Sequence, residues 1–215
     1  MAVELLAQGA IASVLGARWG LPRWWHPINL VLPAAAWAGL AAQIDPAWFL
    51  GAFVAAFLVF GATTWKNGVP LYFSSESAVS ALCELLPAGA GSRVLDAGSG
   101  VGTVLVSLSA RRPDVIVEGV EAALLPWLLS WLRGALNGAG FRASLGDFWD
   151  VDFGRFDFVY AFLSPAPMHG VWDKARREMR PGSVFVSNSF TVPGVAPARV
   201  LDLDGTGRSL YVWHM

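Results

Sequence analysis

The sequence predicts an α/β fold, a doubly wound and mostly parallel sheet of seven strands preceded by a transmembrane helical hairpin. Three observations support this. Strand-like and helix-like segments alternate regularly along the C-terminal two thirds of the chain. A glycine-rich turn, Asp96 to Gly102, follows the first of these strands. Two runs without a charged residue, 28–44 and 47–65, precede the alternation.

Residues 1–66 have a lipid-like composition. They contain only five charged side chains, which are Glu4, Arg18, Arg23, Asp45 and Lys66. A helix needs roughly 17–25 mostly apolar residues to span a bilayer. The runs 28–44 and 47–65 meet this length, so we predict a membrane anchor over 1–66 and a globular domain over 67–215. Buried helices of a soluble domain are the alternative.

The flanks of the two runs predict their orientation. Arg18, Arg23 and Lys66 lie at one end of the predicted hairpin, and Asp45 lies alone at the other. Because basic residues stay in the cytoplasm, we expect a multi-pass membrane protein whose globular domain lies on the cytoplasmic side. The apolar segment 4–17 is either a short third span or a helix lying in the membrane interface.

Composition excludes several functions. The chain has no basic stripe, so we expect no nucleic-acid partner. A single cysteine, Cys83, excludes an intrachain disulfide framework and a cysteine zinc site, and we assign no metal ligands. The mean hydropathy of +0.50 is high for a soluble domain and agrees with a bilayer partner.

The glycine turn predicts a nucleotide-binding site. Val94 and Leu95 end a buried strand, and a helix is expected from Val101 to Leu108. Glycine lets the backbone turn sharply and lets a ligand come close, and the helix N-terminus offers free N–H groups. The candidate ligand-binding residues of this turn are Asp96, Gly98, Ser99, Gly100 and Gly102. A dinucleotide motif would place its third glycine later, and a phosphate-binding loop would carry a lysine.

Two further acids follow strand ends. The strand over 114–121 ends at Glu121, 23 residues after Gly98, where an acid can accept hydrogen bonds from ribose hydroxyls. Asp147 follows the strand over 141–145, where a carboxylate could accept from an adenine amino group. Phe148 could flank the ring. Plain turn or core functions for these residues remain the alternatives.

The remaining elements complete the sheet. Ser74 or Ser75 caps a helix before the first strand. The other predicted segments are helices over 124–137 and 168–180, strands over 156–163 and 183–189, and a terminal hairpin over 198–203 and 209–213. At the exit of the 156–163 strand, Tyr160 and Ser164 could orient a nucleophile, and His169 could act as a base or simply lie on the helix surface.

The ordered motifs resemble those of the class I methyltransferases. The acid followed by Gly-x-Gly-x-Gly in that family matches Asp96 to Gly102, and residues 177–183 resemble the helix end before its fifth strand. The resemblance covers about residues 70–215. It implies a Rossmann-like methyltransferase fold and S-adenosylmethionine (SAM) as cofactor, with Glu121 on the ribose and Asp147 near the adenine.

A narrower resemblance is to the membrane-anchored protein-lysine methyltransferases, which include the enzyme acting on the ATP synthase c-subunit. It rests on Glu121 with Pro126-Trp127-Leu128, on Asp147-Phe148-Trp149, and on 162–165. Val101-Gly102-Thr103 departs from that family's usual Asp-Gly-Arg. The resemblance implies methyl transfer to a lysine amine of a membrane-associated protein. A lipophilic substrate such as a quinone or lipid, or a SAM-binding module without catalysis, remains the alternative.

Overall fold

The computed structural model describes residues 2–18, 25–43, 45–56, 74–87, 89–138, 140–203 and 207–215. They divide into two compact units, Met1–Val54 and Ala55–Met215, which are described separately. The domain boundary predicted between residues 66 and 67 lies outside the described residues.

The first unit consists of helices α1 (Ala2–Arg18), α2 (Trp25–Ala41) and α3, whose bounds are Pro46–Ala56. Helices α1 and α2 pack closely, since a Cβ at Gly9 would lie 2.6 Å from the Leu30 carbonyl oxygen. The predicted segment 4–17 is therefore a helix paired with α2. The unit leaves many large apolar side chains exposed, among them Leu6, Ile11, Val14, Val31, Leu32, Trp48, Leu50 and Phe53.

The predicted transmembrane hairpin does not appear among the described residues. None of the helices in the described ranges combines the length and the apolar composition that a membrane span requires. Helix α2 begins before the run 28–44 and ends at Ala41, and α3 is an 11-residue helix. Residues 57–65 of the second run lie outside the described residues.

The second unit is built on a seven-stranded sheet in the order β3-β2-β1-β4-β5-β7-β6. Its strands are β1 (Arg93–Ala97), β2 (Ile116–Glu121), β3 (Phe141–Leu145), β4 (Phe158–Ala161), β5 (Val184–Asn188), β6 (Arg199–Leu203) and β7 (Arg208–His214). Strands β1 to β5 are parallel, and β7 runs antiparallel to both β5 and β6. The doubly wound, mostly parallel sheet is thus confirmed, and its order reverses between β1 and β4, where open α/β sheets bind ligands.

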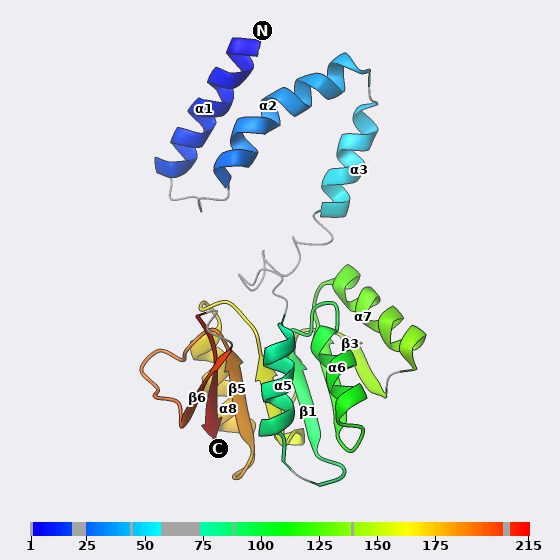
Figure 1. The fold of residues 1–215 in the computed structure, drawn as a ribbon, viewed down its shortest axis with the longest axis vertical. Coiled ribbons are helices and arrows are strands. Elements are labelled where there is room, and N and C mark those ends of the chain that lie inside the picture. Colours follow the sequence, from blue (N-terminus) through cyan, green and yellow to red (C-terminus); the bar gives the residue numbers. More distant parts are fainter. Residues whose placement is uncertain are drawn as a thin grey trace. The chain divides into compact units, whose positions relative to one another are not determined.

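Helices cover both faces of this sheet (Figure 1). Helices α5 (Glu76–Leu85) and α6 (Thr103–Arg111) pack on one face, and α8 (Met168–Glu178) packs on the other. Helix α7 (Leu124–Asn137) packs against α6, β2 and β3. Alternate strand residues supply the two cores, because successive side chains of a strand point to opposite faces.

Local sequence explains where these helices begin. The Ser75 side chain accepts a hydrogen bond from the Ala78 N–H and so caps α5, as predicted. Helix α6 begins at Thr103, two residues later than expected, because Gly102 still adopts a left-handed conformation. Two short 3-10 turns, Phe148–Asp150 and Phe153–Arg155, fall between β3 and β4 and were not predicted.

Candidate cofactor and active site

The glycine turn joins the carboxyl end of β1 to α6. Gly98, Gly100 and Gly102 have φ angles of 83°, 54° and 76°, in the left-handed region that side chains disfavour. The N–H groups of Gly98 and Ser99 both donate to the Val120 carbonyl at 3.0 Å. The turn therefore needs its glycines for backbone conformation, and it is fixed to the end of β2.

Glu121, the last residue of β2, holds the turn in place. One carboxylate oxygen accepts from the Gly100 N–H and the other from the Ala123 N–H, each at 2.8 Å. Burial raises the pKa of Glu121, and the backbone donors at Ala123 and Gly100 partly oppose that rise. Because each carboxylate oxygen has a second lone pair, hydroxyls of a ligand can still donate to it.

Asp96 and Tyr160 lie side by side at the point where the strand order reverses. They are register partners in β1 and β4. The Tyr160 hydroxyl lies 2.8 Å from the Ser74 hydroxyl and accepts a hydrogen bond from the Asn188 amide at 2.8 Å. Asp96, Tyr160 and Ser74 line one small cavity, together with Gly98, Ser99, Val101, Thr103, Val104 and Phe162.

The electrostatics of this cavity favour a cation. Burial and, to a smaller extent, the negative charge of Glu121 raise the pKa of Asp96 to about 8. Burial also raises the pKa of Tyr160, with a smaller contribution from the charge of Asp96. A positively charged ligand would stabilise the Asp96 carboxylate, since opposite charge favours the ionised form.

The other two predicted catalytic residues differ in position. Ser164 is buried just after β4, and its hydroxyl has no hydrogen-bond partner among the described residues. The neighbouring Leu163 packs on the glycine turn, where a Cβ at Gly98 would lie 2.9 Å from its side chain. His169, in contrast, lies in the first turn of α8 with its side chain 72% exposed, 3.2 Å from Asp173. The structure does not bring His169 to the cavity.

The predicted adenine-binding residues follow β3. The Asp147 side chain accepts from the Trp149 N–H at 3.2 Å and caps the short turn Phe148–Asp150. Phe148 is buried in the core beneath α8, and its ring centroid lies 4.8 Å from that of Trp149. Trp149 is the more exposed of the two rings. Contact of these residues with an adenine stays a prediction.

Sequence reasoning missed three residues that complete the site. Ser74 and Asn188 hold the Tyr160 hydroxyl, and Arg133 of α7 donates to the Val101 carbonyl at 2.9 Å. Asn188 ends β5, so the strand-end rule that identified Glu121 would also have found it. Nothing in the sequence places Ser74 or Arg133 near the turn, because both contacts join elements far apart in the chain.

The residues present fit SAM on three grounds. The left-handed turn holds the backbone open to a ligand at a helix N-terminus. The buried Asp96 matches the positive charge that SAM carries on its ammonium and sulfonium groups. The buried Ser99 and Ser164 hydroxyls lack partners among the described residues, and buried polar groups normally have one.

Comparison with known proteins agrees with this geometry. A family model described as the ANTKMT methyltransferase domain matches residues 96–199. An adenine nucleotide translocase lysine N-methyltransferase from Mus musculus is 30% identical over 151 residues, which are 67% of this chain and 62% of that protein. The chain thus spans less than two thirds of this relative. The resemblance points to this enzyme rather than to the ATP synthase c-subunit enzyme named above.

Solved structures share the fold. An RNA methyltransferase from Salinibacter ruber, in complex with S-adenosyl-L-homocysteine, superposes with a TM-score of 0.61 at 22% identity over 66% of this chain and 93% of that chain. A precorrin-6y C5,15-methyltransferase from Geobacter metallireducens gives 0.53 at 12% identity, over 66% and 90% of the two chains. Fold and family match together identify the second unit as a class I SAM-dependent methyltransferase domain, with SAM as its cofactor.

Proposed function

We propose that the chain transfers the methyl group of SAM to a lysine amine of a membrane-associated protein. The observation that carries this proposal is the 30% identity to a lysine N-methyltransferase, in a chain whose glycine turn, Glu121 and Asp96 form a site suited to SAM. The exposed apolar helices of the first unit support a substrate at a membrane.

The reaction is a displacement in which a nitrogen–carbon bond forms as the sulfonium carbon–sulfur bond breaks. SAM supplies a methyl group on an already activated leaving group, so the chain mainly positions the reactants and excludes water. The acceptor amine must lose its proton before it attacks. The Tyr160 hydroxyl, held between Ser74 and Asn188, and the unpartnered Ser164 hydroxyl orient that amine.

The cofactor-binding residues divide into four groups in this proposal. Glu121 accepts from the ribose hydroxyls through its remaining lone pairs, while it continues to hold Gly100. Asp147 and Phe148 lie at the end of β3 and contact the adenine. Asp96 attracts the cationic end of the molecule. The backbone of Gly98 to Gly102 forms the floor of the site.

We also propose that the first unit attaches the chain to a membrane, with the methyltransferase domain on the cytoplasmic side. Helices α1 to α3 expose large apolar side chains that an aqueous surface disfavours. The basic residues flanking the runs 28–44 and 47–65 support the cytoplasmic side.

The acceptor is tested by incubating the full chain and membranes of its source organism with SAM labelled on the methyl group. We expect label in the protein fraction, and methyl-lysine after acid hydrolysis. Label in the organic extract instead would identify a lipid or quinone as acceptor and overturn the lysine proposal. SAM binding without transfer to either fraction would show a binding module without catalysis.

Two variants test the residue assignments in the same assay. Tyr160→Phe should lower the transfer rate about tenfold, because it removes the hydroxyl that orients the amine, and one such hydrogen bond contributes about 1.4 kcal/mol. His169→Ala should leave the rate unchanged, because its side chain lies exposed beside Asp173. The reverse result would make His169 the base and remove the orienting function of Tyr160.

The affinity for SAM should depend on pH through Asp96. Below its pKa of about 8 the carboxyl group is mostly neutral, so we expect the affinity to rise as pH increases through 8 and to level off above it. The pKa of Asp96 in the folded protein lies above its value of 3.8 in the unfolded chain. The contribution of Asp96 to stability is therefore full below pH 3.8 and is lost as pH rises through 8. Titration calorimetry and denaturation across this range measure both trends. Asp96→Asn should abolish both, and an unchanged pH profile in that variant would contradict the assignment.

A further inference from the structure

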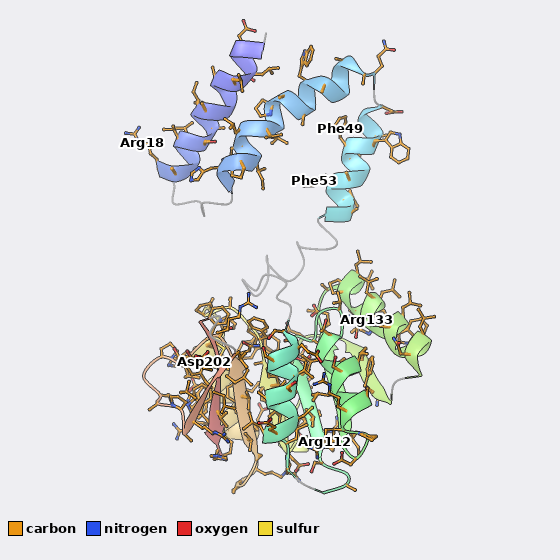
Figure 2. All side chains as sticks on the ribbon, viewed as in Figure 1. Arg18, Phe49, Phe53, Arg112, Arg133 and Asp202 are labelled. Carbon is orange, nitrogen blue, oxygen red and sulfur yellow. The ribbon has the colours of Figure 1, made fainter. Side chains whose placement is uncertain are left out.

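Helix α7 exposes a continuous apolar side. Six of its large apolar residues are between 41% and 76% exposed: Leu124, Leu128, Leu129, Trp131, Leu132 and Leu136. At 100° per residue they occupy one side of the helix, together with Leu125 and Ala135. In Figure 2 a row of side chains on α7 projects away from the sheet. Monomeric soluble domains rarely expose such a patch.

The side of α7 that packs on the domain carries Trp127, whose indole N–H donates to the Ala143 carbonyl of β3, and otherwise smaller residues. Pro126 and Ser130 are the buried residues of this helix. Ser130 contacts the glycine turn so closely that a Cβ at Gly102 would overlap its hydroxyl, and the Phe141 ring packs on Gly134. Packing inside the domain therefore does not explain the exposed leucines and Trp131 of α7. Contact with an apolar medium outside the domain explains them.

The charges around α7 indicate which medium this is. Residues 122–146 carry two charged side chains, Arg133 and Arg142, and no acid. On the elements packed against α7, Glu118 pairs with Arg93 and Glu121 is buried. An apolar helix face bordered by positive charge is suited to an anionic lipid surface. A second copy of the chain would bring like charges together.

We propose that α7 is an interfacial helix, which lies with its apolar side in an anionic lipid bilayer and seats the methyltransferase domain directly on the membrane. This surface belongs to the second unit. Arg133 donates to the Val101 carbonyl, so the helix that contacts lipid also contacts the cofactor turn. The proposal does not depend on the acceptor being a lysine, since a lysine of a membrane-associated protein and a lipid or quinone can both be methylated from this position.

The test places a fluorescent label at single cysteines in the full chain, with Cys83 replaced by Ala. Leu128→Cys and Leu136→Cys report on α7. Val200→Cys is the matched control, because Val200 is an apolar residue 53% exposed on β6, at the opposite edge of the sheet. The labelled proteins are mixed with vesicles of phosphatidylcholine and phosphatidylserine whose acyl chains carry bromine as a quencher. Circular dichroism confirms that each variant is folded.

We expect the labels on α7 to lose at least about half of their emission, because an interfacial helix lies ~5–10 Å into the headgroup and acyl boundary. The label at position 200 should keep its emission. Equal quenching at all three positions, or none on α7, would overturn the proposal. Shielding of the α7 labels that rises with protein concentration without vesicles would also overturn it and show a second copy on this face.

Discussion

Replacing Glu121 with Ala is expected to weaken SAM binding about 5- to 30-fold, equivalent to about 1–2 kcal/mol. Two effects add. The variant loses the acceptor for the ribose hydroxyls. It also frees the buried N–H groups of Gly100 and Ala123, which both donate to this carboxylate, so the turn loses its fixed conformation. Equilibrium dialysis with labelled SAM measures the change.

Glu118→Ala is the matched control for this prediction. Glu118 lies on the same strand and carries the same charge, but it pairs with Arg93 rather than with the glycine turn. Its loss should leave SAM affinity unchanged within about twofold, since this ion pair does not line the cavity. Equal weakening by both variants would mean that negative charge on β2, and not the position of Glu121, determines binding.

Gly102→Ala is expected to destabilise the domain by about 2–5 kcal/mol, the sum of left-handed strain and overpacking. The φ angle of 76° disfavours any side chain, and the new Cβ would overlap the Ser130 hydroxyl of α7. The helix would have to move away from the turn. Equilibrium urea denaturation measures the loss of stability.

Gly138→Ala separates the two causes. Gly138 also has a left-handed φ, 59°, but nothing lies within 4 Å of a Cβ built there. This variant should cost only the conformational strain, about 1–2 kcal/mol. If Gly102→Ala and Gly138→Ala destabilise equally, the close approach of α7 to the turn contributes nothing.

Much of the sheet could be predicted because its local patterns are strong. The segment Leu124–Asn137 is bounded by an acidic strand end and two glycines, and the structure has this helix with the same bounds. Strand β3 likewise matches its predicted range, Phe141–Leu145. The terminal hairpin was readable from its turn, but the antiparallel pairing of β7 with β5 is a contact between distant segments that no local pattern specifies.

The site was predictable only where strand ends reveal it. Asp96 and Glu121 follow from the rule that ligands lie at carboxyl ends of parallel strands. The placement of Tyr160 beside Asp96 depends on the register of β1 and β4, and its hydrogen bonds depend on Ser74 and Asn188. The exposure of His169 depends on the rotation of α8 about its own axis, which a motif does not encode.

The helix bounds in the N-terminal unit differ from the predicted runs because a hydropathy run measures composition, not the limits of a helix. Helix α2 starts at Trp25, three residues before the charge-free run, and Gln43 after it has a left-handed φ of 52°. The apolar composition remains a physical fact of the first unit, whose helices leave Trp48, Leu50 and Phe53 largely exposed.

Hydrogen-exchange mass spectrometry of the full chain with and without SAM tests directly whether SAM binds at the glycine turn, because it both detects and locates the cofactor. We expect slower hydrogen exchange at the amides of residues 97–103 and 121–123, where backbone N–H groups of the turn and of Ala123 donate to Val120 and Glu121. Residues 199–203 on the far edge of the sheet should exchange as before. No protection at millimolar SAM, or protection confined to other segments, would contradict the assignment of this site.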